Sequence, residues 1–519
     1  MCVKKLLLLS LLLFHFTSFS MALASPKTAP ASNAAPPAPI KYTVYQDQAN
    51  GYSLSYPDTM TVDDHESALR TIISDQTTKI EIYRDDFTGT VTNSDVYITY
   101  GNSFTKNTKD HVIQEETNQT IHRLPVHGLK WMRAKLIHAD DDKNYYASYE
   151  IVKNKNEVYT LFFKSSEPIT IDKEVVQSFK VTARSGAANL IRPAVAITPN
   201  WNDETKALYQ HYFAATAPLR WGIFEKTSPK NFTYLKSLEQ KLDYQFPVVT
   251  RYQSLTGQYF PMEDLKNAYA NGRLVELTMQ TFLWGAKDEV NRSIMYDVLD
   301  GRYDAYLNSY AKKLKEFGHP VLFRLNNEMN GDWCWYSAFN TSKDTDIYTG
   351  VWRYIYQIFQ ANGVNNVLWV WNPHSPSKPT FAWNHYMMYY PGDEYVDIIG
   401  LTGYNNGTYY PGETWRSFDQ IYGNLYKEYA DLFVQPFMIA EFGSNSVGGD
   451  KAAWVRDMFA SLPRYDRIKL AVWWSSTDYD AKGQPARIYN LDENAAVIEA
   501  FREGLTKGAS LQDGSNPVK

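Results

Sequence analysis

The feature that most limits the fold is a repeating pattern between residues 201 and 508, in which short apolar runs alternate with longer helical segments. Short apolar runs indicate buried strands, and a helix between successive runs requires parallel strands with helical crossovers. Eight such units in roughly 300 residues predict a TIM barrel of the α/β class. The runs expected to be strands are Arg220–Phe224, Phe246–Tyr252, Leu274–Thr281, Pro320–Glu328, Asn366–Asn372, Val396–Tyr404, Pro436–Gly443 and Lys469–Ser475.

An open doubly wound sheet is the alternative that the same alternation allows. Its dinucleotide-binding form places a Gly-rich loop directly after the first strand. No such loop follows Phe224, where the chain continues Glu-Lys-Thr-Ser-Pro. The barrel is therefore favoured, and we expect it to occupy residues 201–508.

Residues 41–185 differ in composition and pattern, with frequent Thr and Val and recurring strand-like runs. This pattern predicts a small α+β accessory domain ahead of the barrel. A Gly- and Pro-containing linker is expected at 186–200 and a tail at 509–519. The expected strands are Lys79–Tyr83, Val96–Tyr100, Tyr145–Val152, Val158–Phe163 and Lys180–Ala183, and the expected helix is Asp172–Phe179.

The first 24 residues are typical of a secretion signal. Lys4 and Lys5 precede an apolar run, Leu6–Phe16, and Ala22-Leu23-Ala24 offers a cleavage site. A Pro/Ala-rich tether at 25–40 follows. We expect a secreted, extracellular protein of bacterial type, without a membrane span in the mature chain; an uncleaved membrane anchor is the alternative.

Cysteine usage agrees with an exported bacterial protein. Cys2 would leave with the signal, so the mature chain would hold Cys334 alone and form no internal disulfide. Secretion without disulfides fits a bacterial protein better than a small disulfide-rich one.

Two glutamates carry the chemistry that the sequence offers. Glu328 and Glu441 end the fourth and seventh expected strands, and each is followed by turn residues. The active site of a TIM barrel lies at the carboxyl ends of its strands. A pair of carboxyl groups meeting there is what cleavage of a glycosidic bond requires, and that reaction needs neither a metal nor a cofactor. We expect none.

Several sequence blocks, in a fixed order, resemble glycoside hydrolase family 26. They are Leu299–Asp304, Glu328–Trp333, Trp369–Pro373, Tyr390–Asp393, Tyr395–Gly400 and Ile439–Ser444. The resemblance implies a retaining enzyme of the endo-β-1,4-mannanase kind, with Glu328 as general acid/base and Glu441 as nucleophile. Two stretches of the N-terminal region, Gly51–Pro57 and Val175–Val181, resemble PsbP/Mog1-like domains.

The same resemblance implies a set of substrate-binding residues. Tyr404 matches a tyrosine that hydrogen-bonds the nucleophile, and Trp473, or its neighbour Trp474, matches a tryptophan that lines the sugar site. Asn327 stands where the family's mannanases usually have His, and Thr402 where the family often has Asp. These departures open the question of which sugar is bound.

Two further residues complete the predicted set of substrate-binding residues. Trp333 follows the fourth strand, where it could stack on a sugar or pack the loop, and Arg324 could orient the site through its charge. The aromatic content of 39 Tyr, 25 Phe and 14 Trp suits sugar stacking as well as a large core. The net charge of −5 provides no basic field for nucleic acid.

We therefore expect a secreted retaining endo-β-glycosidase that hydrolyses a polysaccharide, with β-1,4-mannan as the first candidate. β-1,3-Xylan, mixed-linkage β-glucan and an exopolysaccharide are alternative substrates. A non-hydrolytic glycan-binding protein is the alternative from another functional class. The N-terminal domain is expected to dock to a cell wall or glycan.

Overall fold

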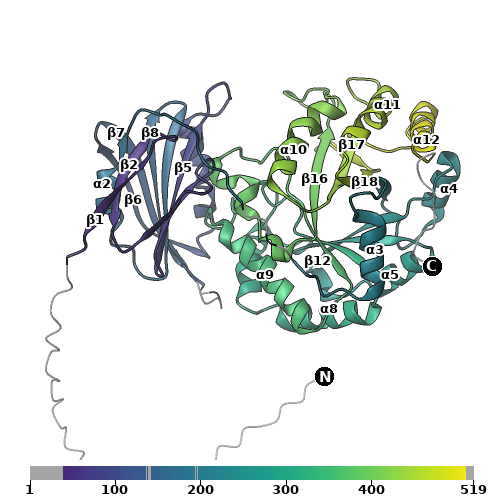
Figure 1. Ribbon diagram of the computed structural model, residues 1–519, viewed down its shortest axis with the longest axis horizontal. Helices are drawn as coiled ribbons and strands as arrows, with labels where there is room; N and C mark the ends of the chain where they lie inside the picture. The colour runs from purple at the N-terminus through teal and green to yellow at the C-terminus, as the bar shows by residue number, and fades with distance from the viewer. Residues whose placement is uncertain (1–38, 136, 138–141, 193–194, 196, 510–519) are drawn as a thin grey trace, which may run out of the picture. The chain divides into compact units, whose positions relative to one another are not determined.

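Eight parallel strands close into a barrel in the computed structural model, which is drawn in Figure 1. The strands follow one another around the barrel in chain order. The structure describes residues 39–135, 137, 142–192, 195 and 197–509. The barrel confirms the predicted fold class. Its strands are β11 (Arg220–Phe224), β12 (Val248–Ser254), β13 (Leu274–Gln280), β14 (Val321–Leu325), β15 (Val367–Trp371), β16 (Ile398–Asn405), β17 (Phe437–Ser444) and β18 (Ile468–Trp474).

Strand alternation divides the barrel side chains between two apolar layers. In β15, Leu368 and Val370 belong to the cluster inside the barrel, whereas Trp369 and Trp371 pack in the layer shared with the helices. Successive strand residues point to opposite faces, and both faces of a parallel sheet are covered. Because helix α3 (Asp203–Phe213) packs with the inner cluster, the barrel interior is a filled core that opens only toward the carboxyl ends of the strands.

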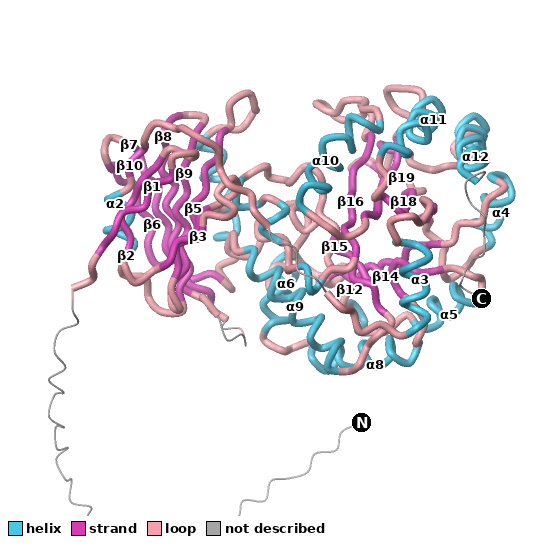
Figure 2. Tube along the Cα trace, viewed as in Figure 1, coloured by secondary structure: helices cyan, strands magenta, loops and turns pink. Residues whose placement is uncertain are grey.

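Helices surround the barrel strands, as the cyan tube segments around the magenta strands in Figure 2 show. Their apolar positions follow the expected spacing: in α8 (Asp304–Phe317), Leu307, Tyr310 and Leu314 are buried and Gly318 ends the helix in the left-handed conformation. The other helices of this layer are α4 (Thr233–Leu242), α5 (Met262–Ala270), α6 (Asp288–Asn291), α7 (Ile294–Leu299), α9 (Thr345–Ala361), α10 (Phe418–Leu432), α11 (Lys451–Ser461) and α12 (Ala495–Ala509).

The N-terminal region contains two antiparallel sheets. The larger has the order β3-β4-β5-β9-β8-β7-β6 and the smaller the order β1-β2-β10. This region fits the predicted α+β character, while its likeness to PsbP/Mog1 domains stays a prediction. The elements are β1 (Tyr42–Asp47), β2 (Tyr52–Pro57), β3 (Thr61–Asp63), β4 (Thr71–Ser74), β5 (Thr78–Asp86), α1 (Ser94–Gly101), β6 (His111–Ile121), β7 (Leu124–Arg133), β8 (Tyr145–Asn154), β9 (Glu157–Ser165), α2 (Asp172–Ser178) and β10 (Lys180–Val181).

The strand predicted at Val96–Tyr100 was wrong, because this segment is part of helix α1. Asn93 is its N-cap, and its side chain accepts a hydrogen bond from the backbone N–H of Val96. Asp95 lies in the first turn, where a negative charge is favourable. These start signals outweigh the strand preference of the β-branched residues that follow.

Residues from Tyr42 onward form one compact unit, in which the N-terminal sheets and the barrel share an apolar cluster. Buried ion pairs join them: the Lys164 ammonium lies 2.7 Å from the Asp344 carboxylate, and the Lys343 ammonium lies 2.8 Å from Glu150. Asp344 and Lys343 end the loop that follows β14. The loop that contains Glu328 therefore rests on the N-terminal sheets.

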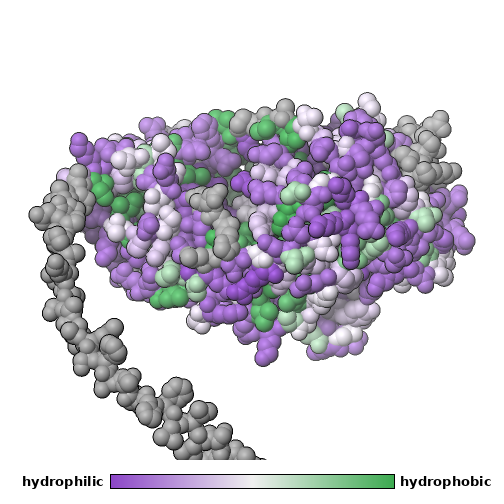
Figure 3. Space-filling model, turned by 90° about the horizontal axis from the view of Figure 1, so that it is seen from below, coloured by the Kyte–Doolittle hydropathy of each residue, from purple (hydrophilic) through white to green (hydrophobic). Residues whose placement is uncertain are grey.

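The face shown in Figure 3 is mostly hydrophilic, with small, scattered hydrophobic areas among its described residues. None of the helices in the described part of the chain combines the length and apolarity needed to cross a bilayer. The expected signal (1–24), most of the tether (25–40) and all but the first residue of the tail (509–519) lie outside the described residues.

Candidate active site

Glu441 owes its orientation to a bulge in β17. On the side of β16, Leu401 pairs with Ile439 and the next residue, Thr402, pairs with Glu441, so one extra residue, Ala440, is inserted. Ala440 belongs to the inner cluster, and Phe442 lies in the helix-facing layer. A bulge shifts the alternation of a strand, so Glu441 points into the barrel mouth instead of toward the helices.

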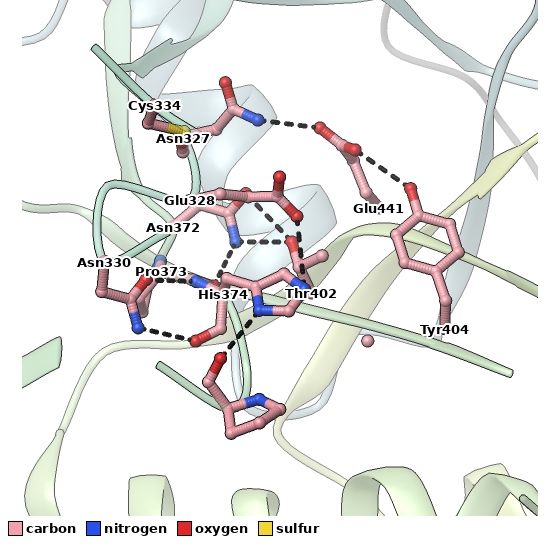
Figure 4. A network of polar contacts seen from close by, with 12 residues as sticks. Asn327, Glu328, Asn330, Cys334, Asn372, Pro373, His374, Thr402, Tyr404 and Glu441 are labelled. Carbon is pink, nitrogen blue, oxygen red and sulfur yellow. Dashed lines mark hydrogen bonds and ion pairs between the residues drawn. The ribbon is translucent and has the colours of Figure 1, made fainter. Parts of the chain in front are cut away.

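Four donors surround the Glu441 carboxylate. The Arg324 guanidinium lies 2.7 Å away, the Tyr404 hydroxyl donates at 3.0 Å and the Asn327 amide donates at 3.2 Å. The Tyr252 hydroxyl is the fourth donor. Figure 4 shows Asn327 and Tyr404 directed at the two oxygens. An ionised carboxylate accepts only, so this arrangement suits its charged form.

Arg324 lies beneath Glu441 and is fully buried. Its guanidinium donates to the Tyr252 hydroxyl at 2.6 Å and to the Thr278 hydroxyl at 2.8 Å. It also lies 3.3 Å from Glu276, whose pKa is raised to about 7 by burial, although Arg324 acts in the opposite direction. Arg324 therefore orients Glu441 from below, and the prediction that it binds substrate is not supported by its position.

The sequence predicted that Glu328 ends the fourth strand. In the structure β14 ends at Leu325, and Glu328 lies in the turn that follows it. Asn326 and Glu328 both have positive φ, 49° and 55°. The Glu328 N–H donates to the Asn372 carbonyl at 2.7 Å, and the Asn326 side chain accepts from the Thr281 N–H at 2.8 Å. Left-handed backbone is uncommon outside glycine and concentrates at functional sites, where the surrounding structure holds it.

The environment of Glu328 favours its protonated form. Burial first, and then the negative charge of Glu441, raise the pKa of Glu328 to about 8. His374 lies 3.9 Å from the Glu328 carboxyl group, and burial lowers the pKa of this histidine, so it adds no positive charge near neutral pH. At pH 7 one carboxyl group of the pair is protonated and the other is surrounded by donors.

Both glutamates line a cavity of about 820 Å³ at the mouth of the barrel. Tyr404, Trp333 and His374 share its wall. Charged side chains also line the cavity: Lys378, Glu413, Arg416, Asp478 and Arg487. Asn327 is not among the lining residues. It is 4% exposed, and its amide donates to Glu441 without facing the cavity.

The prediction for Trp473 is corrected by the structure, and its neighbour takes its place. Trp473 is fully buried in the helix-facing layer, where its indole N–H donates to the Tyr489 carbonyl at 2.8 Å. Trp474 lines the cavity and stacks on Phe224, with ring centroids 3.8 Å apart. Val472 lies inside the barrel, so alternation directs residue 473 outward and residue 474 toward the mouth.

Tyr252 and Glu276 also belong to the site, although neither was predicted from the sequence. Tyr252 ended the second expected strand, the same position that singled out the glutamates, and this signal was available. Glu276 lies within a run expected to be a plain buried strand. Asp478 and Arg487, on the β19 (Thr477–Tyr479) and β20 (Pro485–Ile488) hairpin, had no signal in the sequence.

Residues 282–435 match the family model described as Glycosyl hydrolase family 26. Endoglucanase H of Acetivibrio thermocellus is 30% identical over 297 residues, which cover 56% of this chain and 31% of that protein. A mannan endo-1,4-beta-mannosidase of Bacillus subtilis is 28% identical over 265 residues, which cover 50% of this chain and 63% of that protein. The chain thus spans less than two thirds of the length of these relatives.

Among solved structures, the chain is similar to the catalytic domain of a GH26 endo-beta-1,4-mannanase from Bacillus sp. JAMB-750. The TM-score is 0.46 at 20% identity, over 60% of this chain and 91% of that chain.

Proposed function

The barrel of this chain belongs to glycosyl hydrolase family 26, and from this premise we propose that it hydrolyses a β-linked polysaccharide with retention of configuration. Glu441 acts as the nucleophile and Glu328 as the general acid/base. The observation that supports this proposal is the contrast between two carboxyl groups in one cavity: Glu441 is surrounded by four donors, and the pKa of Glu328 is raised to about 8.

In the first step, a Glu441 oxygen attacks the anomeric carbon and forms a glycosyl-enzyme ester. Glu328 gives its proton to the glycosidic oxygen as the bond to the leaving sugar breaks. Formation of the ester removes the negative charge of Glu441. The Coulombic contribution that raised the pKa of Glu328 then disappears, which prepares Glu328 to act as a base.

In the second step, Glu328 takes a proton from water, and the water oxygen attacks the same anomeric carbon from the face that the first sugar left. The ester bond breaks and Glu441 leaves as a carboxylate. Two displacements at one carbon restore the original configuration. Arg324, Tyr252 and Tyr404 stabilise the carboxylate again as it is released.

The test uses one variant of each glutamate. Glu441→Ala should reduce hydrolysis by at least ~10³-fold, since no nucleophile remains. Glu328→Ala, assayed with a good leaving group, should recover turnover on addition of azide and release a glycosyl azide of retained configuration. NMR of the first wild-type product gives its anomeric configuration, and an inverted product would exclude the double displacement.

We propose β-1,4-mannan as the first substrate and mixed-linkage β-glucan as the second candidate. The mannan endo-1,4-beta-mannosidases among the relatives favour mannan. The longer and slightly more identical alignment with Endoglucanase H, together with Asn327 in place of histidine, favours a glucan. Sizing the products from glucomannan, barley β-glucan, β-1,3-xylan and a bacterial exopolysaccharide would separate these candidates, and binding without cleavage would favour a non-hydrolytic protein.

We also propose that the protein is secreted, because an enzyme that hydrolyses an extracellular polysaccharide has to reach it outside the cell. This proposal rests on the expected signal at residues 1–24. N-terminal sequencing of protein recovered from the culture medium tests it: a mature terminus near Ser25 supports cleavage, and retention of the whole chain in the membrane fraction supports an anchor.

A further inference from the structure

Exposed aromatic rings gather on the catalytic face of the barrel. Within the described residues, the Tyr and Trp side chains classed as exposed are Tyr42, Tyr100, Tyr259, Trp284, Trp333 and Tyr479. Four of these lie on segments that follow β12, β13, β14 and β18, the ends that also carry the glutamates. An exposed ring has an apolar face available for stacking. Several exposed rings on one face can therefore stack on successive sugar units of a long glycan chain.

Tyr100 is the exception in sequence, because it belongs to helix α1 of the N-terminal region, yet it lies beside the same loop. Its hydroxyl donates to the Asp332 carboxylate at 2.6 Å, and its ring contacts Phe339 with centroids 4.8 Å apart. Asp332 precedes Trp333, which lines the cavity and contacts His374 at 4.9 Å. The hydrogen bond to Asp332 thus places Tyr100 of α1 beside the loop that carries Trp333 into the cavity wall.

Helix α1 packs against both the N-terminal sheet and the barrel loop that follows β15, and β5 of that sheet contacts the same loop. Tyr97, one turn before Tyr100, is buried with its ring 4.6 Å from Phe381, and its hydroxyl is 2.8 Å from that of Thr160. Asp85 accepts the N–H of Ala382 at 2.7 Å. Tyr100 is 41% exposed on this fixed support, so little conformational freedom is lost when a ligand stacks on its ring.

We propose that Tyr100 and Asp332, next to Trp333 at the edge of the catalytic cavity, form a distal binding site for sugar units that lie outside that cavity. A pyranose ring would stack on the exposed aromatic faces, and the half-exposed Asp332 carboxylate would accept hydrogen bonds from its hydroxyl groups. The N-terminal region is then part of the glycan-binding cleft. This inference rests on the proposed function, since it concerns the same polysaccharide.

The test compares Tyr100→Ala with Tyr42→Ala, which removes another exposed ring of the N-terminal region, on β1. The substrates are length series of β-1,4-manno-oligosaccharides and of mixed-linkage gluco-oligosaccharides. The wild type should show higher kcat/KM on the longest members than on the shortest, and Tyr100→Ala should reduce that ratio by about tenfold. Tyr100→Phe, which keeps the ring, should retain most of the ratio.

An unchanged ratio in Tyr100→Ala, or an equal loss in Tyr42→Ala, would overturn the distal site while leaving the hydrolase proposal intact. If neither series is cleaved, the proposed function fails, and binding alone then decides the distal site. Electrophoresis in gels containing galactomannan or barley β-glucan provides that measurement. Stronger retardation of the wild type than of Tyr100→Ala supports the site, and equal mobility of the two overturns it.

Discussion

Replacing Lys343 by methionine removes the positive charge from a buried ion pair between the loop of Glu328 and the N-terminal sheets. The Lys343 ammonium lies 2.8 Å from the Glu150 carboxylate, and the two side chains are only 4% and 1% exposed. Glu150 also accepts from the Ser148 hydroxyl at 2.6 Å and lies 2.8 Å from His127. The substitution leaves a buried carboxylate without its main counter-charge.

The magnitude follows from the pKa of Glu150. Burial alone would raise this pKa, but the charge of Lys343 and the contact with His127 lower it from 4.5 to about 2. That difference corresponds to about 3 kcal/mol in favour of the charged form in the folded protein. Loss of one partner from other buried pairs costs about 3–5 kcal/mol, so we expect Lys343→Met to lower the free energy of unfolding by about 3 kcal/mol near pH 7.

Urea unfolding followed by tryptophan fluorescence measures the change. The folded pKa of Glu150 lies below its ordinary value, so its stabilising contribution is complete above pH 4.5 and is lost as the pH falls toward 2. The difference between Lys343→Met and wild type should therefore shrink over that range. Lys206→Met is the matched control, because Lys206 is itself exposed and pairs with a fully exposed Asp203, and it should unfold like the wild type.

The double variant Lys343→Met/Glu150→Gln tests the reasoning directly. Glutamine keeps an oxygen acceptor for Ser148 and removes the uncompensated charge, so the double variant should be more stable than Lys343→Met alone. A loss below about 1 kcal/mol in the single variant, or additive losses in the double variant, would show that the pair contributes little.

Other predictions concern the site itself. The kcat/KM of the wild type should fall as pH rises through about 8, because Glu328 loses the proton that it must donate; a basic limb that persists in Glu328→Gln would contradict this origin. Tyr252→Phe should lower kcat by about tenfold or more, because it removes a hydrogen bond to Glu441 within a buried site; an unchanged kcat would exclude a role in orientation. Trp473→Ala should lower the free energy of unfolding, measured by urea titration, by about 3–5 kcal/mol, whereas Trp474→Ala should mainly raise KM. A large loss of stability in Trp474→Ala together with a raised KM in Trp473→Ala would refute the assignment of Trp473 to the core and Trp474 to the cavity.

The barrel was predictable from sequence because each of its strands is a short apolar run between helical segments, and the predicted runs overlap all eight strands. Strand alternation was harder to use, since both faces of a barrel strand are apolar. The sequence Val472-Trp473-Trp474 does not indicate which tryptophan faces the mouth. The bulge at Ala440 left no mark in the sequence either, although it determines where Glu441 points.

The contacts between the N-terminal sheets and the barrel were not predictable. Lys164 and Asp344 are 180 residues apart, and charged residues are ordinarily expected at the surface. Helix α1 was mistaken for a strand because its β-branched residues concealed the capping signal of Asn93. Tyr100 consequently had no predicted place near the cleft, and only the three-dimensional arrangement brings it beside Asp332.

The buried pairs Lys164–Asp344 and Lys343–Glu150 have a practical consequence for protein engineering. A recombinant fragment that begins near residue 201 would expose Asp344 and Lys343 without their partners. The turn that contains Glu328 would then lose its support. Chimaeras that graft a foreign appendage onto this barrel would meet the same difficulty. Chimaeras made by recombining homologous sequences should therefore take all residues from Tyr42 onward from one parent, with the crossover point placed before Tyr42.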